Sequence, residues 1–206
     1  MTKIGLIAMS AKPLHSGHWG LIEIASKEND VVMLFVSLSD RIRPNEFPIL
    51  GSSMERIWRD HAEHALPDNV RIVYGGSPIH KIIKVLGDSS QANSQDTFSV
   101  YGDTEDIASN FPDSLLKKYC GNLFKAGQVI LRPIARSETT DISGTKMRQF
   151  LQDGERSAFI MNTPECIDGA AVWDILRPNT HECMVLLKSF VAEAVRNKAA
   201  AKRRSR

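Results

Sequence analysis

The sequence of 206 residues predicts an α/β fold, in which one parallel sheet carries helices on both faces. Short apolar runs, typical of buried strands, alternate along the chain with segments of helical periodicity. The clearest strand is Val31–Ser37, which is β-branched and aromatic and has no polar residue before Ser37. The clearest helix is Ser52–Ala65, whose apolar residues recur at helical spacing and which Ser52 or Ser53 can cap.

The other elements follow from the same two patterns. The remaining predicted strands are Ile4–Met9, Val70–Tyr74, Thr97–Tyr101 and Gln128–Pro133, and the remaining predicted helices are His18–Lys27, Pro78–Leu86, Ser143–Gln152 and a segment from about Asn179 to Arg196. Gly87–Asp96 is polar and predicts a surface loop. We therefore expect one domain over residues 1–178, a C-terminal helix over 179–195 that packs on it, and a disordered tail over 196–206.

Charge is distributed unevenly between the tail and the rest of the chain. Six of the 26 Lys and Arg residues lie in 196–206, which leaves 20 against 24 acidic residues, a net charge of −4, in residues 1–195. The overall charge of +2 is therefore no argument that the folded body binds nucleic acid.

Composition and cysteine content predict a cytoplasmic protein. The chain is 42% hydrophobic and 24% charged, which is ordinary for a globular protein, and no apolar run approaches the ~20 residues that span a bilayer. The three cysteines show no metal-like spacing, and Ser10 and Lys12 interrupt the apolar N-terminal run before it resembles a secretory signal.

Ligands of parallel α/β sheets bind beyond the carboxyl ends of the strands. The stretches in that position are Ser10–His18, Ser37–Arg43, Gly102–Asp106 and Ala135–Lys146. In the first of them, His15 and His18 bracket Ser16–Gly17 at the start of a helix. Both imidazoles can there face one anion beside free backbone amides, and Gly17 allows a ligand to approach closely. A pair of solvated loop histidines is the alternative.

The segment Asp141–Arg148 opens a second helix in a similar way. Asp141 or Ser143 can cap this helix, and Gly144 removes side-chain bulk at its start. Thr145, Lys146 and Arg148 would surround the helix start with donors and positive charge, as in an anion site. An ordinary capped helix with solvated Lys and Arg is the alternative.

Together the two segments resemble a known superfamily. His15-Ser16-Gly17-His18 followed by Ile142-Ser143-Gly144-Thr145-Lys146-Met147-Arg148 resembles the HxGH and ISxTxxR motifs of the nucleotidyltransferases. Ala11-Lys12-Pro13-Leu14 is similar to the segment that precedes the histidines in nicotinamide-nucleotide (NMN) adenylyltransferases, and the likeness covers roughly residues 3–165. The resemblance implies a Rossmann-like doubly wound parallel sheet of the nucleotidyltransferase type.

The resemblance also implies an activity. Such enzymes transfer a nucleoside monophosphate from a nucleoside triphosphate to a small phosphorylated acceptor, here AMP from ATP to nicotinamide mononucleotide, and release pyrophosphate by direct in-line attack. The residues implied as catalytic are His15, His18 and Lys12, and those implied to hold the nucleotide are Ser10, Gly17, Ser143, Gly144, Thr145, Lys146 and Arg148. Mg²⁺ would accompany the triphosphate, and the sequence shows no dedicated carboxylate cluster for a metal.

Three further residues are candidates for substrate contacts. Arg41 follows the second strand and is a candidate for the acceptor phosphate, with a solvated basic loop as the alternative. Asp103 follows the fourth strand, where related enzymes place a Gly-x-Asp contact, and an exposed acidic turn is the alternative. Trp19 is a candidate for stacking on a base or a nicotinamide, with burial in the core as the alternative.

Two other functions remain open. A cytidylyltransferase that makes a CDP-linked alcohol from CTP shares both motifs, although Arg136-Ser137-Glu138 matches its usual signature only in part. A nucleotide- or RNA-binding protein would use the basic tail, since clustered positive charge attracts phosphate backbones; a solvated tail is favoured over this use. Relatives of this kind often form homo-oligomers.

Overall fold

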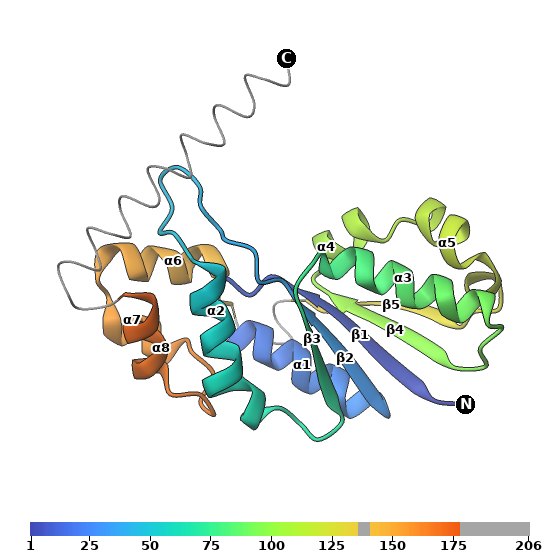
Figure 1. Ribbon diagram of the computed structural model, residues 1–206, viewed down its shortest axis with the longest axis horizontal. Coiled ribbons are helices and arrows are strands. Elements are labelled where there is room, and N and C mark those ends of the chain that lie inside the picture. Colours follow the sequence, from blue (N-terminus) through green and yellow to red (C-terminus); the bar gives the residue numbers. More distant parts are fainter. Residues whose placement is uncertain (136–140, 178–206) are drawn as a thin grey trace, which may run out of the picture.

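A computed structural model describes residues 1–135 and 141–177 of the chain. Five strands form one all-parallel sheet in the order β3-β2-β1-β4-β5 (Figure 1). The strands are β1 (Lys3–Met9), β2 (Val31–Val36), β3 (Val70–Tyr74), β4 (Thr97–Gly102) and β5 (Val129–Pro133). The expected α/β fold class is confirmed, and each expected strand is present within a residue or two of its expected bounds.

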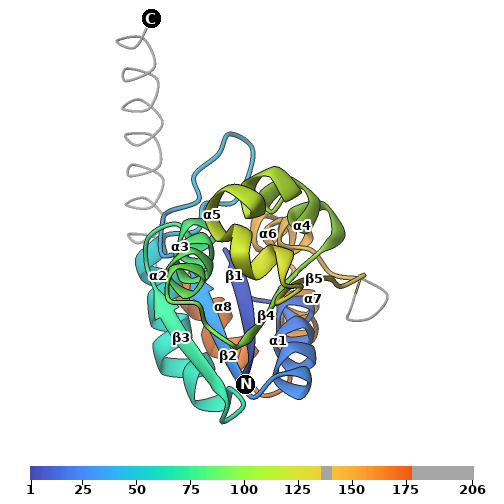
Figure 2. The same ribbon diagram turned by 90° about the vertical axis from the view of Figure 1, so that its right-hand side faces the viewer.

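Helices cover both faces of this sheet. They are α1 (Ser16–Glu28), α2 (Gly51–Ile57), α3 (Pro78–Gln91), α4 (Thr104–Asn110), α5 (Asp113–Lys125), α6 (Gly144–Asp153), α7 (Arg156–Met161) and α8 (Gly169–Leu176). After α2 the chain continues through a π-helical turn, Trp58–Ala62, and a 3₁₀ turn, Glu63–Ala65. Figure 2 shows α3 and α5 on one side of the strands and α1 on the other.

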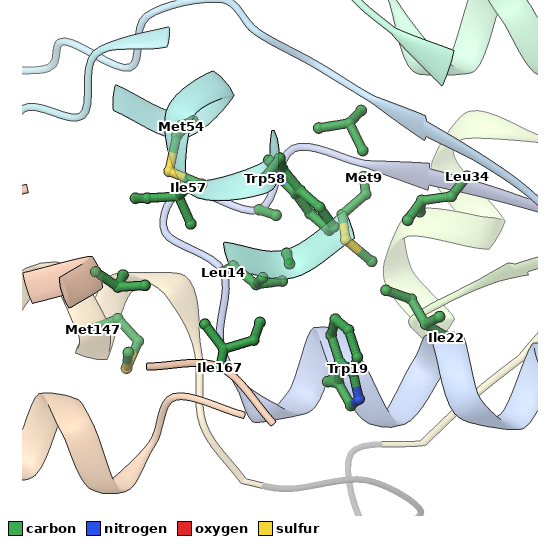
Figure 3. Close-up of a cluster of buried hydrophobic side chains, with 14 of the residues drawn as sticks. Met9, Leu14, Trp19, Ile22, Leu34, Met54, Ile57, Trp58, Met147 and Ile167 are labelled. Carbon is green, nitrogen blue, oxygen red and sulfur yellow. The ribbon is translucent and has the colours of Figure 1, made fainter. Parts of the chain in front are cut away.

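Successive side chains of a strand point to opposite faces of the sheet, so the buried residues form two cores, one on each face. Leu6 and Phe35 pack with residues of α3, α4 and α5, whereas their neighbours Ile7 and Leu34 pack with residues of α1, α2, α6 and α8. Figure 3 shows part of the second core, where side chains of β1, α1 and α2 meet. Both faces are therefore apolar, which is why these strands read as continuous hydrophobic runs.

Several helices differ from the expectation. The first half of the loop expected over Gly87–Asp96 is helical, because α3 continues to Gln91 and buries Ser90 on the face that also buries Leu86, and residues 92–96 are the loop. The helices α4, α5, α7 and α8 were not expected. Their exposed residues are mostly polar, and α4 and α7 span only 7 and 6 residues, so the periodic pattern is short.

The start of α2 is capped from outside the helix. Neither Ser52 nor Ser53 caps it, contrary to the expectation, and Leu50 precedes its first residue. Instead the amide of Gly51 donates a hydrogen bond of 2.7 Å to Oδ1 of Asp40. The segment that follows β2 thereby fixes the start of α2.

Gly51 is expected to tolerate no side chain. A Cβ at this position would lie 1.8 Å from the carbonyl oxygen of Leu38, which is backbone and has little room to shift. We expect Gly51→Ala to lower the free energy of unfolding in urea by about 2–4 kcal/mol. The matched control is Gly121→Ala in α5, where a Cβ would meet nothing within 4 Å. Equal stability of the two variants would contradict the expected clash.

The order of the strands positions a crevice. From β1 to β3, each strand is added at the same edge of the sheet. The chain then crosses back, and β4 pairs with the other side of β1. In open parallel sheets the ligand site lies at this reversal, beyond the carboxyl ends of the strands. Here that position is between the ends of β1 and β4, beside the start of α1.

The expected C-terminal helix over 179–195 and tail over 196–206 lie outside the described residues. Within residues 1–135 and 141–177, no helix is both long enough and apolar enough to cross a membrane.

Candidate functional site

A cavity of about 230 Å³ opens at the reversal between β1 and β4. Its walls come from the loop after β1, the start of α1, the loop after β4 and the start of α6. The sequence-predicted residues that line it are Ser10, His15, Gly17, His18, Asp103, Ser143 and Gly144. The two segments singled out in the sequence, about 125 residues apart, therefore face one another across a single cavity.

The two histidines form the α1 side of the cavity. Their rings stack with centroids 3.7 Å apart and an interplanar angle of 29°. His15 has extended backbone just before α1, and its carbonyl accepts hydrogen bonds from the amides of His18 at 3.0 Å and Trp19 at 3.2 Å. The amide of Ser16 is held by the carbonyl of Asn162 at 3.0 Å, which ties this turn to the end of α7.

His18 is a neutral imidazole at neutral pH. Its side chain is partly buried, and Nδ1 is inaccessible to solvent and has no hydrogen-bond partner among the described residues. Burial lowers the pKa of His18 from 6.5 to about 4. An anion close to this ring would favour the protonated form and raise the pKa again. The ring is therefore able to gain a proton when a negatively charged ligand enters.

The lowered pKa of His18 predicts a pH dependence of stability. Between pH 6.5 and about pH 4 the unfolded chain binds a proton at this position that the folded chain does not. The free energy of unfolding is therefore expected to fall as pH decreases through this window, by up to about 1.4 kcal/mol per pH unit. Urea unfolding at several pH values measures it, and His18→Gln is expected to flatten this part of the slope. A variant with the wild-type slope would contradict the assignment.

The start of α6 forms the opposite side of the cavity. Ser143, rather than Asp141, caps this helix, because its Oγ accepts a hydrogen bond of 3.2 Å from the amide of Lys146. The amides of Gly144 and Thr145 precede that of Met147, the first amide of α6 that donates to a backbone carbonyl of the helix start, so they remain donors for a ligand. With the helix dipole they favour an anion in the cavity.

Lys12 is a buried cation that follows Ala11, a residue of the cavity wall, but does not itself line the cavity. Its side chain is 5% exposed, and Nζ donates hydrogen bonds to Oγ of Ser37 at 3.3 Å and to Oγ of Ser39 at 3.0 Å. Among the described residues no carboxylate forms an ion pair with it. Burial lowers the pKa of Lys12, which the charge of Asp40 partly offsets. A buried ammonium held only by hydroxyl groups is costly unless a ligand supplies negative charge.

Arg148 has partners other than the expected one. The sequence places it among the groups that add charge to a bound phosphate, yet it is 5% exposed and is held by protein atoms. Nη1 donates to the carbonyl of Lys12 at 2.8 Å, Nη2 donates to Oγ1 of Thr145 at 2.9 Å, and Nε lies 3.0 Å from Oε2 of Glu46 as an ion pair. Burial lowers the pKa of Arg148. The guanidinium thus connects α6 to the loops after β1 and β2.

Two of the three proposed substrate contacts lie outside the cavity. Arg41 forms a bidentate ion pair with Glu46, with nitrogen to oxygen distances of 2.8 and 3.0 Å. Trp19 is 7% exposed and packs in the core that includes Met9 and Trp58, where its ring is enclosed rather than free to stack on a ligand (Figure 3).

The remaining predicted residues are nearer to the cavity. Asp103 lines it, and its Oδ1 also accepts a hydrogen bond of 2.8 Å from the amide of Asp106, which caps α4. Thr145 and Lys146 lie in the exposed first turn of α6, and Nζ of Lys146 is 5.0 Å from the ring centroid of Phe150.

A second cavity of about 260 Å³ adjoins the first, and sequence reasoning did not find it. The two share Ser10, Gly102 and Asp106, among others, and the second is lined further by Ser37, Asn110 and apolar residues of α3 and α4. Burial and the nearby charge of Asp103 raise the pKa of Asp106. The position of Ser37 and Ser39 could have indicated a role in the site, since they directly follow β2, the strand next to β1. Nothing in the sequence indicates that Glu46 contacts Arg41 and Arg148.

No protein-family model matches the chain, and no curated protein matches it. A solved structure with partial similarity is that of Thermotoga maritima TmcAL bound with alpha-thio ATP, at a TM-score of 0.46 and 14% sequence identity. The match covers 85% of this chain and 55% of the other, so this chain spans about half the length of that protein. Similarity at this level carries no conclusion about what this chain binds.

Proposed function

We propose that this chain is a nucleotidyltransferase that transfers AMP from ATP to nicotinamide mononucleotide, forming NAD and pyrophosphate. The observation that carries the proposal is the buried ammonium of Lys12, whose partners among the described residues are hydroxyl groups. Lys12 follows Ala11, which lines the cavity onto which two helix starts open. Amide donors and imidazoles that line one cavity, with a cation next in the chain to its wall, are groups that bind a triphosphate. The order of the two motifs resembles this class of enzyme.

In this proposal the protein positions two anions and neutralises charge. A phosphate oxygen of the acceptor attacks the α-phosphorus of ATP, a new P–O bond forms, and the bond to the β-phosphate breaks with its electron pair leaving on pyrophosphate. Charge grows on the phosphoryl oxygens during this step, so donors fixed in advance lower the barrier. His15 and His18 serve the α- and β-phosphates, and the Gly144 and Thr145 amides serve the β- and γ-phosphates.

The two adjoining cavities suit a reaction with two substrates. The first carries the histidines and the α6 amides and would take the triphosphate. The second is lined by apolar residues such as Ile79 and Phe111 together with Asn110, and would take the ring of the acceptor. Ser10 and Asp106 line both cavities, at the place where the two reacting phosphates would meet.

Mg²⁺ suits this proposal as a companion of the triphosphate. Among the described residues no group of three or more His, Cys, Asp or Glu side chains is placed to hold an ion. Mg²⁺ commonly keeps water and phosphate oxygens as ligands with one or two carboxylates, and Asp103 and Asp106 offer carboxylates at the cavity. When bound, the ion would neutralise charge on the phosphates.

Pyrophosphate release by the purified full chain tests the proposal. We expect release with Mg²⁺, ATP and nicotinamide mononucleotide, and none when either substrate is left out. Release with CTP and a phosphorylated alcohol instead would move the assignment to a cytidylyltransferase. Binding of nucleic acid without pyrophosphate release from any substrate pair would reject an enzyme of this class.

A further inference from the structure

Glu46 lies where segments from three parts of the chain meet. It belongs to a turn closed by two backbone hydrogen bonds between Arg41 and Ile49, of 2.8 and 3.0 Å. Its carboxylate accepts both hydrogen bonds from the guanidinium of Arg41 and forms the ion pair with Nε of Arg148. The loop after β2 is thereby bound to α6, which lies about 100 residues later in the chain.

Arg148 extends this connection to the loop after β1. Its two terminal nitrogens donate to the carbonyl of Lys12 and to the hydroxyl of Thr145. Gly144 leaves the space that the guanidinium needs, because a Cβ there would lie 3.1 Å from Nη1 of Arg148 and 3.5 Å from the Lys12 carbonyl oxygen. One guanidinium therefore sets the distance between the buried lysine and the start of α6.

Glu46 supplies the counter-charge of Arg148 in this arrangement. The Arg148 side chain is 6% exposed, and Glu46 is its one carboxylate partner among the described residues. A buried cation that loses its counter-charge tends to move toward solvent or to draw in another anion. Loss of the Glu46 charge would then release Arg148 from the Lys12 carbonyl and alter the spacing of the two phosphate-binding segments.

We propose that Glu46 is a positioning residue for the triphosphate: through Arg148 its carboxylate holds the Lys12 loop and the start of α6 at the spacing the phosphates require. This inference rests on the proposed function. Glu46 itself does not line either cavity, so it acts through the groups it holds. In this proposal Arg41 does not contact the acceptor. Its guanidinium holds the Glu46 carboxylate in place for Arg148.

Glu46→Gln separates positioning from general stability, because it removes the charge and keeps the shape. We expect the KM for ATP to rise about tenfold while kcat changes by less than about threefold, since the segments are displaced but the reacting groups remain. Hydrogen exchange by mass spectrometry is expected to quicken in residues 11–18 and 143–148, with or without ATP. Glu46→Asp keeps the charge and is expected to restore part of both effects.

The matched control is Glu28→Gln, which also removes the carboxylate of a two-contact arginine pair, with Arg132 at 3.1 and 3.3 Å. It is expected to leave the KM for ATP and exchange in both segments unchanged. Unchanged KM and exchange in Glu46→Gln would overturn the proposal, and tighter ATP binding would overturn it by showing that Glu46 competes with phosphate for Arg148. If the wild type shows no turnover, the proposed function fails, and the exchange measurement still decides whether Glu46 holds the two segments.

Discussion

Replacing His18 with alanine is expected to lower kcat/KM for pyrophosphate release by about a thousandfold, the loss seen when a fixed donor to a developing oxyanion is removed. His18 stacks on His15 at the start of α1, and both line the cavity. Its imidazole is neutral at pH 7, because burial lowers its pKa to about 4. Charge that grows on the phosphoryl oxygens would draw a hydrogen bond or a proton from this ring, and alanine offers neither.

The histidine variant needs a control for folding. His80→Ala removes an exposed imidazole from α3 and is expected to keep wild-type turnover. Circular dichroism and urea unfolding should show that His18→Ala remains folded, since no side chain among the described residues depends on Nδ1 of His18. Turnover within about tenfold of the wild type would mean that the HxGH segment does not contact the reacting phosphates.

Proton uptake by His18 on ATP binding is a second, independent test of the same site. If ATP raises the pKa of His18 from about 4, binding near pH 5.5 takes up protons. Calorimetric titration in buffers of different ionisation enthalpy measures this uptake directly, and it should disappear in His18→Gln. Because the readout is binding rather than turnover, it separates a triphosphate site from the identity of the acceptor.

The central strands β1 and β2 could be predicted from the sequence because they are buried on both faces of the sheet. Such strands are continuous apolar runs, and Val31–Val36 is the plainest of them. The helices α4 and α5 fill the connection between β4 and β5, yet they expose most of their polar residues and bury only a narrow stripe. In α4 the one buried residue, Ile107, is too little for the helical period to stand out over seven positions. The 13-residue α5 does carry the period, because Leu116, Cys120 and Leu123 are buried at helical spacing.

The candidate site could be predicted where function depends on local spacing. His15 and His18 are three residues apart in the chain, Ser143 and Gly144 are adjacent, and each pair stands at a helix start and lines the cavity. The partners of Lys12 and Arg148 could not be predicted in the same way. The Arg148 bond to the Lys12 carbonyl spans 136 residues, and only the packing of α6 against the loop after β1 brings the two together.

The partner of a charged side chain also cannot be predicted from its residue type alone. Arg41 and Arg148 carry the positive charge that a phosphate site would use, yet both guanidinium groups are directed at Glu46. An arginine is satisfied equally well by a carboxylate and by a phosphate, because both accept its paired donors. Lys12 differs from them, since its partners within residues 1–135 and 141–177 are hydroxyl groups and include no carboxylate. The sequence could not show this distinction.

Lys12→Met is therefore expected to have opposite effects on activity and stability. Turnover should fall by about 10²–10³-fold, because a preorganised cation at the triphosphate is lost. The free energy of unfolding should stay at the wild-type value or rise, because methionine fills a similar volume and removes a buried ammonium that burial disfavours. Ser37 and Ser39 keep each other as partners, with their hydroxyl oxygens 2.9 Å apart.

Lys81→Met in α3 is the matched control for the lysine variant, since Nζ of Lys81 donates to the carbonyl of Tyr74 at 2.8 Å and neither residue lines a cavity. It is expected to keep wild-type turnover and to lose a little stability. Urea unfolding and pyrophosphate release are measured on the same preparations of each variant. A Lys12→Met protein that is less stable and fully active would show that the ammonium serves the fold. A protein that is at least as stable as the wild type and inactive would show that the buried ammonium serves the reaction rather than the fold.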